Sequence, residues 1–513
     1  MIFTLNQYPE YRELVKQMSV RDLLKAVSCP QAIAEEQALE KGYQMVFLHK
    51  TTRVAAEAFI EQYNRDAAVP AIFCSDTECG TGDMLRECIK FPSMRALGEC
   101  GSPELAYQAG RVTAQQSVEA GFRWSISPCV DILLREDAPA ISTRAAGCDA
   151  QTVIDIAGGY MRGLQDGGVV ATIKHFPGDG ICAYDQHLTT AVNPLSKEQW
   201  WDTFGKVYRT LIDQGAMCIM PGHISLPAFD QPDPELGLCP PATLSYPLLT
   251  TLLREELGFA GIICSDAMTM AGFAGFMNYY EACATYLKCG GDIMEFVRTD
   301  EVFFEKMTGL VDSGFLPLSV LQDRAYRTMC FTRQVRESFR PQPELSIDAY
   351  ALVQQITAGS VRIVRDRKKV LPFQAKADSR ILVVDFSNVY TGNTHSDDFY
   401  QALCKAGYQA DFWHDPGPVR LEEAAERREY DLIVCSVANE FCCGTNGLSL
   451  HGLLARNMMG GWSKLGTPVV FLCFGHPYFH HQFDAFVDTL INTYGVSTYT
   501  HTQVLKLLFG EQT

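Results

Sequence analysis

Residues 169–187 read VVATIKHFPGDGICAYDQH, an apolar run that passes directly into charged side chains. The first five residues are mostly β-branched and form a run short enough to be a buried strand. Lys174 and His175 stand at the end of this run, and a Gly/Pro loop leads from them to Asp185 and His187. The pattern predicts a buried parallel strand whose end and following loop carry polar chemistry.

The alternation of strand and helix continues on both sides of this stretch. Apolar runs predict strands at 71–75, 124–127, 169–173, 217–220, 261–264 and 292–295. Helical patterns lie between them at 103–120, 150–165, 197–214 and 247–256. Repeated strand–helix units with parallel strands are typical of a (β/α)8 TIM-type barrel, which we expect over residues 1–335.

A second domain is predicted after a linker at 336–348, which contains Pro341 and Pro343. In residues 349–513 the pattern resumes, with strands expected at 381–386, 432–436, 469–474 and 489–492. This alternation predicts a smaller, doubly wound α/β sandwich domain. No Gly-x-Gly-x-x-Gly motif follows its first strand, so nothing supports a nucleotide, and we expect no cofactor.

Length, charge and cysteine usage narrow the class of protein. A chain of 513 residues exceeds the size of a single hydrophobic core, so two or three domains are expected. The net charge of −17 argues against nucleic acid as a partner and favours a neutral or cationic one. The 19 cysteines are scattered, often in apolar runs, and their odd number favours the reducing cytoplasm. Neither a signal peptide nor a membrane helix is predicted.

Polar side chains follow several of the predicted barrel strands. Asp76, Lys174, His175, His223 and Asp266 each stand at or just beyond a strand end. The carboxyl ends of barrel strands share one rim, where the loops build the active site. We therefore expect these residues to gather at that rim.

Asp185 and His187 form an Asp-x-His pair on the loop. Such an Asp can accept the imidazole Nδ1–H, which fixes the tautomer and leaves Nε2 for proton transfer. An ordinary loop ion pair is the alternative interpretation. No further His/Asp cluster at ligand spacing accompanies the pair, and zinc normally requires three or four ligands, so no metal is expected.

Asp266 terminates the apolar run 261–264. Glycosidases need a carboxylate on one face of the anomeric carbon, as a nucleophile or as a base that activates water. The alternative is that Asp266 only caps the helix that follows.

Taken together and in this order, these segments resemble glycoside hydrolase family 3, and more closely its bacterial β-N-acetylglucosaminidase branch. The resemblance is carried by KHFPGDGICAYDQH at 174–187, PATLS at 241–245, LLREELGF at 252–259 and Ser265-Asp266. It covers roughly residues 15–335 well and the C-terminal domain loosely. It implies a catalytic barrel with Asp266 as nucleophile and His187, oriented by Asp185, as acid/base.

The resemblance also implies a sugar-binding set, which is Asp76, Arg144, Lys174, His175 and His223. Each has a plainer alternative, such as a helix cap for Asp76, a surface ion pair for Arg144 and a buried structural role for His175. Two departures from the family pattern bear on the substrate. Cys79-Gly80-Thr81-Gly82 replaces the usual Gly-Gly-Arg-Val, and Asp179 stands where His is common.

The expected activity is retaining, exo-acting hydrolysis of terminal β-linked N-acetylglucosamine, and the preference for the acetamido sugar is implied by the resemblance alone. Three alternatives stay open at this point: a glycoside phosphorylase, a β-glucosidase and a catalytically silent sugar-binding protein. A histidine in place of a carboxylate repels an incoming phosphate less, which keeps the phosphorylase in view. The expected partner is a small carbohydrate, with no membrane, and the oligomeric state is left open.

Overall fold

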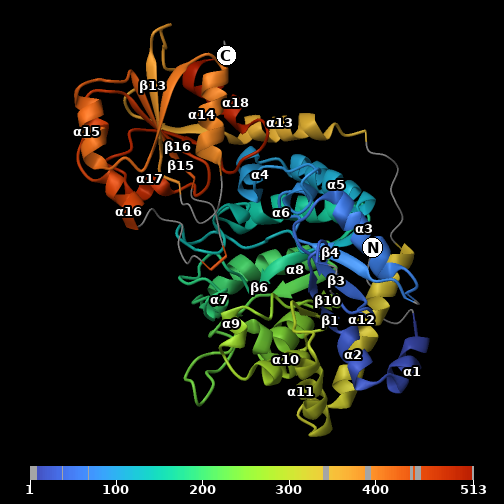
Figure 1. Cartoon of the computed structure of the whole chain (residues 1–513). Helices are drawn as coiled ribbons and strands as arrows, with labels where there is room; N and C mark the ends of the chain where they lie inside the picture. Colours follow the sequence, from blue (N-terminus) through green and yellow to red (C-terminus); the bar gives the residue numbers. More distant parts are fainter. Residues whose placement is uncertain are drawn as a thin grey trace. The chain divides into compact units, whose positions relative to one another are not determined.

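The computed structural model describes residues 8–36, 39–67, 69–338, 346–387, 394–438, 443–444 and 452–510. They form two compact units (Figure 1). The first unit comprises Met1–Lys90, Ser102–Ala140 and Ala145–Ala349, and the second comprises Phe91–Gly101, Ile141–Arg144 and Tyr350–Thr513. The second unit thus includes two short segments from the early part of the chain. Of the predicted linker 336–348, residues 339–345 lie outside the described part.

The first unit is built on a seven-stranded, all-parallel sheet of order β10-β8-β6-β5-β4-β3-β2. Its strands are β2 (Gln31–Ala32), β3 (Met45–Leu48), β4 (Ile72–Ser75), β5 (Phe122–Ser125), β6 (Val170–Phe176), β8 (Cys218–Pro221) and β10 (Ile262–Ile263). Strand β1 (Ser28–Cys29) pairs in parallel with β11 (Met294–Glu295), and a parallel bridge joins Cys264 to Ile293. A separate parallel pair is formed by β7 (Ala191–Val192) and β9 (Ile224–Ser225). This is the parallel α/β arrangement expected of a barrel-type domain.

Helices accompany the strands of the first unit. They are α1 (Glu10–Gln17), α2 (Val20–Ala26), α3 (Arg53–Asn64), α5 (Pro103–Glu119), α6 (Ala150–Asp166), α7 (Lys197–Trp200), α8 (Lys206–Asp213), α9 (Ala271–Ala274), α10 (Tyr279–Cys289), α11 (Glu301–Asp312) and α12 (Leu318–Ser338). Glycine residues allow some of these helices to pack closely. A Cβ on Gly163 of α6 would lie 2.2 Å from the carbonyl oxygen of Tyr107 in α5, so only glycine allows the two backbones to approach this far.

The core of the first unit lies among its strands. Buried residues from β3, β4, β5, β6, β8 and β10 form one hydrophobic cluster, with Trp124 and Phe331 among its large side chains. The indole N–H of Trp124 donates to the hydroxyl of Thr172 at 2.7 Å, which satisfies its one polar group. Most residues of these parallel strands are buried, and their sequences are accordingly apolar runs with few polar residues, without strict alternation.

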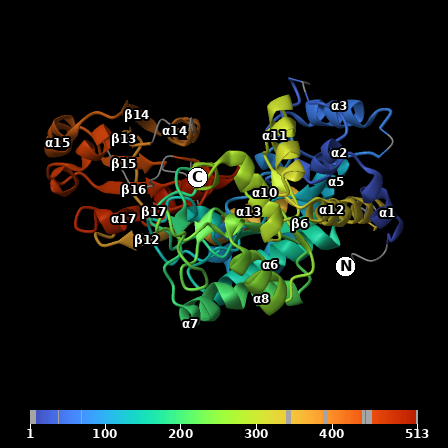
Figure 2. The ribbon, with the colours of Figure 1, turned by 90° about the horizontal axis from the view of Figure 1, so that it is seen from below.

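The second unit contains a six-stranded sheet of order β12-β17-β16-β15-β13-β14, in which only β12 is antiparallel. The strands are β12 (Arg362–Asp366), β13 (Arg380–Asp385), β14 (Gln409–His414), β15 (Leu432–Val437), β16 (Val469–Cys473) and β17 (Thr489–Asn492). Figure 2 shows β13, β15 and β16 running side by side. The helices are α4 (Met94–Cys100), α13 (Ala349–Ser360), α14 (His395–Lys405), α15 (Pro418–Glu426), α16 (Gly452–Ala455), α17 (Phe479–Gln482) and α18 (Thr500–Phe509).

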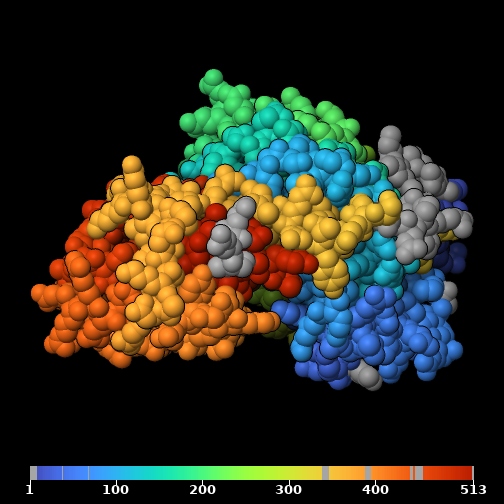
Figure 3. All heavy atoms as spheres, turned by 90° about the horizontal axis from the view of Figure 1, so that it is seen from above, coloured from blue at the N-terminus to red at the C-terminus, as the bar shows by residue number. Residues whose placement is uncertain are grey.

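Both faces of this second sheet are covered. Leu382 and Val384 of β13 pack in a cluster that includes Leu421 of α15, whereas Ile381 and Val383 pack in another with residues of α14 and α18. Successive residues of a strand point to opposite faces, so the two clusters lie on the two sides of the sheet. In Figure 3 the orange and red residues of this unit pack as one continuous body of atoms.

The predicted elements that differ from the structure do so for identifiable reasons. Strands β1 and β2 are not predicted from the sequence, because they have only two residues each and Pro30 separates them. The buried four-residue strand β3 is also missed by the prediction. The helix predicted at 197–214 contains a π-helical segment, Trp201–Gly205, between α7 and α8. Strands β12 and β14 lie at the edges of their sheet and are half-exposed, so they lack an apolar run.

Among the described residues, no helix is both long enough and apolar enough to span a membrane.

Candidate active site

Most of the predicted site residues stand at the carboxyl ends of the first unit's strands. Asp76 follows β4, Lys174 and His175 lie near the end of β6, and Asp266 follows β10 closely. Since these strands are parallel members of one sheet, their carboxyl ends share one edge. The sheet topology therefore brings residues far apart in the sequence to one place.

Lys174 is held by two carboxylates. Its Nζ donates to Asp76 Oδ1 at 2.9 Å and lies 2.7 Å from Glu78 Oε1. The side chain of Lys174 is 5% exposed and that of Asp76 is 42% exposed, so Asp76 presents the accessible surface of this group. Asp76 and Lys174 were predicted, whereas Glu78 was missed even though it stands two residues beyond Asp76 in the sequence.

His175 pairs with a buried carboxylate that sequence reasoning did not assign. Its Nδ1 lies 2.7 Å from Asp131 Oδ2, and the same oxygen accepts the backbone N–H of His175 at 3.2 Å. Burial raises the pKa of Asp131, but the charge and hydrogen bond of His175 outweigh it and lower that pKa below the ordinary value. Asp131 therefore orients the His175 ring. The available sequence signal was the place of Asp131 shortly after the predicted strand 124–127.

Asp179 lies beside Asp131, but its neighbours do not compensate the cost of burying its charge to the same extent. Its backbone N–H donates to Asp131 Oδ1 at 2.6 Å, while its own Oδ2 is buried and has no hydrogen-bond partner in the described structure. Burial, and then the charge of Asp131, raise the pKa of Asp179 to about 6. This second carboxyl is therefore poorly suited to carry charge where it stands.

The loop after β6 has a backbone that requires its glycines. Gly178 and Gly180 have φ angles of 125° and 85°, in the region that L side chains rarely adopt. A Cβ on Gly178 would lie 2.2 Å from the Phe204 ring. The loop is further held by Asn193, whose Nδ2 donates to the Gly178 carbonyl at 2.9 Å. These contacts direct the chain toward Asp185 and His187.

The predicted Asp185–His187 pair is present as a direct hydrogen bond. His187 Nδ1 lies 2.5 Å from Asp185 Oδ1, and the same oxygen accepts the backbone N–H of His187 at 3.0 Å. The Asp185 side chain is fully buried and that of His187 is 22% exposed. A neutral imidazole held this way by a buried carboxylate carries its proton on Nδ1, which makes Nε2 the nitrogen with a lone pair.

The loop that carries Asp185 and His187 is hydrogen-bonded to the segment that follows Asp266. The backbone N–H of Ala271 donates to the His187 carbonyl at 3.0 Å, and the hydroxyl of Thr190 donates to the Gly272 carbonyl at 2.9 Å. A Cβ on Gly272 would lie 2.5 Å from the Gln186 carbonyl oxygen. The two parts of the site are thus in backbone contact.

His223 makes contacts to protein groups through both ring nitrogens. Nε2 lies 3.0 Å from the Ala267 carbonyl, which can only accept, so Nε2 carries the proton. Nδ1 lies 3.0 Å from the hydroxyl of Thr243, which therefore donates to it. Burial lowers the pKa of His223, which favours the neutral ring. The ring is thus bonded to Ala267, the residue that follows Asp266. Contact between His223 and a sugar stays a prediction.

The surroundings of Asp266 favour the ionised form of its carboxyl group. Burial raises its pKa, but the surrounding histidines, His175 first and then His223 and His187, lower it on balance below the ordinary value. The backbone N–H of Ala267 donates to Oδ1 at 2.8 Å. A carboxylate kept ionised near neutral pH, at the end of a strand and close to His187, is suited to nucleophilic chemistry.

Arg144 is the one predicted site residue that belongs to the second unit. It ends the short 3-10 helix Ser142–Arg144, which belongs to the second unit. The other seven predicted residues all belong to the first unit. The role of Arg144 in sugar binding therefore stays a prediction.

One triad at this site has the residue types of a metal centre. The ligand atoms of Cys129, Asp131 and His175 all lie within 4.8 Å of one another. Their polar atoms already bond to each other, since Asp131 accepts from His175 and from the thiol of Cys129 at 3.1 Å. This arrangement is explained as an Asp–His pair without an ion.

Comparison with known proteins agrees with this geometry. Residues 10–330 match the model of the glycosyl hydrolase family 3 N-terminal domain. A Cellulomonas fimi protein named beta-N-acetylglucosaminidase/beta-glucosidase is 29% identical over 489 residues, which cover 91% of this chain and 86% of that protein. A beta-hexosaminidase of Pasteurella multocida is 29% identical over 294 residues, 56% of this chain and 81% of that protein.

Solved structures share the fold. The structure titled beta-glucoside phosphorylase BglX bound to 2FGlc has a TM-score of 0.88 at 24% identity, and the match covers 100% of this chain and 96% of that one. A family 3 β-N-acetylglucosaminidase of Paenibacillus sp. has a TM-score of 0.79 at 21% identity, covering 96% and 97%. The family match spans more than half of the chain and includes the strands that carry Asp76, Lys174 and Asp266. The chain therefore belongs to glycosyl hydrolase family 3 and is a glycoside hydrolase.

Proposed function

We propose that this protein is a retaining, exo-acting β-N-acetylglucosaminidase with Asp266 as nucleophile and His187–Asp185 as acid/base. The observation that carries the proposal is the buried Asp185 bonded to Nδ1 of the part-exposed His187, on a loop fastened beside Asp266. The arrangement supplies a carboxylate that is kept anionic and an imidazole of fixed tautomer. Double displacement needs one group of each kind.

In the first step an oxygen of Asp266 attacks the anomeric carbon as the bond to the leaving oxygen breaks. The protonated His187 gives its Nε2 proton to that oxygen, so that the leaving group departs as an alcohol. A glycosyl ester on Asp266 remains. The negative charge of Asp185 stabilises the imidazolium before the transfer and holds its orientation.

In the second step His187, now neutral, accepts a proton from water through Nε2. The resulting hydroxide attacks the anomeric carbon from the side that the leaving group vacated and displaces the Asp266 carboxylate. Two inversions give net retention of the β configuration. Both the nucleophile and the acid/base residue lie in the first unit.

The sugar-binding part of the proposal assigns contacts with the sugar hydroxyls to Asp76, Lys174, His175 and His223. The exposed carboxylate of Asp76, fixed by Lys174, supports this role. For Arg144, a sugar-binding role is proposed from the resemblance to the family alone. The preference for N-acetylglucosamine is supported by the names of the Cellulomonas and Paenibacillus proteins. The first of these names also includes β-glucosidase, so glucosides are the nearest alternative substrates.

The proposal extends to the architecture and to the compartment. We infer a closed eight-stranded barrel followed by a doubly wound sandwich, with a division near residues 336–348. The β1–β11 pair and the Cys264–Ile293 bridge support closure, and the strand order supports the sandwich. The odd number of cysteines supports a reducing cytoplasm.

Phosphate as the second-step acceptor is the other candidate. The solved structure of a beta-glucoside phosphorylase matches this chain over its whole length. In addition, the acid/base group here is a histidine, which repels a phosphate anion less than a carboxylate would. Phosphate would take the place of water at the glycosyl ester and release a sugar phosphate.

The deciding experiment compares nitrophenyl β-N-acetylglucosaminide and β-glucoside, each with and without inorganic phosphate. Release from the acetamido sugar without phosphate, yielding free sugar, is the expected result. The Asp266→Asn variant should lose this activity, whereas Asp312→Asn, an exposed carboxylate on α11, should keep it. A fluorinated sugar with a good leaving group should label Asp266, as mass spectrometry of its peptide would show.

The remaining outcomes each redirect the assignment. Rate dependence on phosphate with sugar phosphate as product would make the protein a phosphorylase. Activity on the glucoside alone would overturn the acetamido preference. Turnover of neither substrate, together with binding of the free sugar, would indicate a sugar-binding protein.

A further inference from the structure

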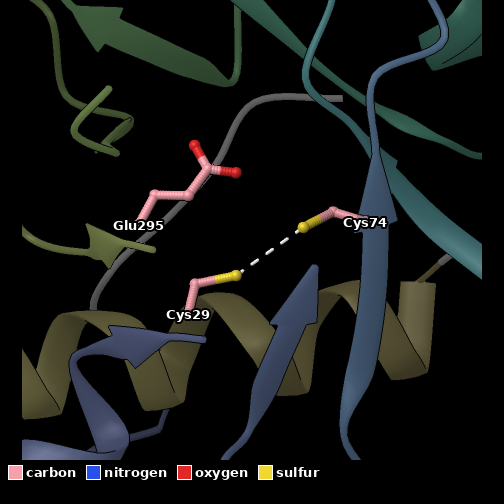
Figure 4. Close-up of side chains that lie close together, drawn as sticks. All are labelled: Cys29, Cys74 and Glu295. Atoms are coloured by element: carbon pink, nitrogen blue, oxygen red, sulfur yellow. Dashed lines mark hydrogen bonds between the residues drawn. The ribbon is translucent and has the colours of Figure 1, made fainter. Parts of the chain in front are cut away.

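A second group of ligating side chains lies within the first unit. Cys29 ends β1, Cys74 lies in β4 and Glu295 ends β11. Figure 4 shows the two thiols pointing toward each other, with the Glu295 carboxyl group beside them. All three are buried, with Glu295 only 3% exposed. The proposed reaction uses none of them.

Glu295 is the unusual member of the group. Its Oε1 is buried and has no hydrogen-bond partner in the described structure, and its Oε2 receives only a long contact of 4.0 Å from the thiol of Cys264. A buried carboxyl group without a strong partner is costly, and native proteins generally compensate such groups. Burial, followed by the charge of Cys29, raises the pKa of Glu295 well above its ordinary value. The charge of Lys174 offsets these effects only in part, so the surroundings do not balance an ionised Glu295.

The spacing of the ligand atoms matches that of a tetrahedral cation site. The two Sγ atoms are 3.7 Å apart, and the three ligand atoms all lie within 4.8 Å of one another. Two thiolates at the usual zinc–sulfur distance of about 2.3 Å, separated by the tetrahedral angle, lie about 3.8 Å apart. The sulfurs are thus already at the separation that a shared ion imposes, and a small movement of the carboxylate would complete three ligands.

We propose that Cys29, Cys74 and Glu295 bind a single divalent cation of the zinc class. Thiolate sulfur favours such borderline-soft ions over magnesium or calcium. Cys264 or a water molecule is the available fourth ligand. Binding releases the protons of the two thiols and of the Glu295 carboxyl group, so affinity should rise with pH.

Such an ion would have a structural role. It would join the β1–β11 pair to β4 of the seven-stranded sheet. In that sheet β4 lies two positions from the edge strand β2. Bonds from one ion to three strands stabilise the folded state, because the unfolded chain cannot present the three ligands together. The inference does not depend on the catalytic proposal, since no reacting group is among the ligands.

The test begins with metal analysis of the full chain, purified under reducing conditions from cells supplied with zinc. A single zinc ion per chain is expected. After removal of zinc with a chelator, the melting temperature should fall, and added zinc should restore it. Cobalt added to the metal-free protein should give thiolate-to-cobalt charge-transfer absorption and the visible bands of tetrahedral cobalt.

Variants locate the site. Cys29→Ser, Cys74→Ser and Glu295→Gln should each reduce the bound metal and the cobalt bands. Cys283→Ser is the matched control, because Cys283 is equally buried on α10 but has Met268 as its sulfur contact. If a cluster variant fails to fold, the removal and return of zinc in the wild type still decides the matter.

Two results would overturn the proposal. One is a wild-type protein that contains no metal and gains neither cobalt bands nor a higher melting temperature on metal addition. The other is a count of free thiols, made on the native protein without reductant, that shows Cys29 and Cys74 to be joined in a stable disulfide.

Discussion

One oxygen of Asp185 holds His187 at two points: it lies 2.5 Å from the ring Nδ1 and accepts the backbone N–H at 3.0 Å. The ring and the main chain of the same residue are therefore fixed by a single, fully buried carboxylate. Neither rotation of the imidazole nor a change of tautomer is possible without breaking this pair. In the proposed reaction Asp185 is thus a positioning residue for proton transfer.

Replacing Asp185 with Asn should lower kcat by about 10²–10⁴-fold with little change in KM, because the amide favours the wrong tautomer of His187. The loss should be larger for an alkyl glycoside than for a nitrophenyl glycoside, whose leaving group needs less protonation. Asp202→Asn, an exposed carboxylate downstream of the loop, serves as control. Equal losses on both substrates would argue against a role in proton donation.

Gly272→Ala should misplace the acid/base loop. The added Cβ would lie 2.5 Å from the Gln186 carbonyl and 2.7 Å from that of Thr189, so the loop must shift. A displacement of this kind should reduce kcat by roughly 10–100-fold. Gly309→Ala is the control, because a Cβ on that helical glycine has nothing within 4 Å. Kinetics and circular dichroism on both variants would check this, and unchanged kcat in Gly272→Ala would contradict it.

Asp179→Asn should stabilise the protein at alkaline pH. The pKa of Asp179 is about 6 in the folded state, which is higher than its value in the unfolded chain. Ionisation of Asp179 therefore destabilises the folded state. This effect begins as pH rises above about 4 and is complete above about 6. The variant should gain about 2–3 kcal/mol in free energy of unfolding at pH 8 relative to wild type, and nothing near pH 3. Urea unfolding at the two pH values measures the difference, and a gain independent of pH would contradict the electrostatic cause.

The change in the free energy of unfolding caused by Asp292→Asn should depend on pH in the opposite direction. Arg254 and Arg327 bind this buried carboxylate at 2.6 and 2.7 Å, and the arginines outweigh burial to hold its pKa well below the ordinary value. Its contribution is present above the unfolded pKa of about 4 and is lost as pH falls through the folded value. We expect a loss of about 3–5 kcal/mol at pH 7 that shrinks in acid.

The control for this pair is Asp323→Asn, which removes an exposed partner of Arg324 and should cost less than about 1 kcal/mol. Chemical denaturation at pH 7 and pH 3 would separate the two variants. A loss for Asp292→Asn that stays constant across this range would show that packing, and not charge, is responsible.

Sequence patterns identified the residues whose chemistry is local. Asp185 and His187 are two positions apart on one loop, so their pairing could be predicted without a fold, and the 2.5 Å contact confirms the pairing itself. The strand ends that carry Asp76, Lys174 and Asp266 could also be placed, because continuous apolar runs mark buried parallel strands. The family was recognisable from the same residues.

Partners supplied by other strands could not be predicted from the chain alone. Asp131 reaches His175 across 44 residues, and Glu78 reaches Lys174 from the end of another strand. Nothing local indicates such pairs, since any of the chain's many carboxylates has the same chemistry until the sheet order brings one of them close.

The sequence by itself therefore determined most of the strand–helix alternation, the family and the candidate reacting groups, because period, turn chemistry and motif spacing are encoded over a few residues. Only the tertiary structure decided which carboxylates remain ionised. Asp131 and Asp179 are both buried, yet the pKa of one is lowered and that of the other is raised. The difference arises because His175 faces Asp131, and burial and electrostatic neighbours exist only once the strands have assembled.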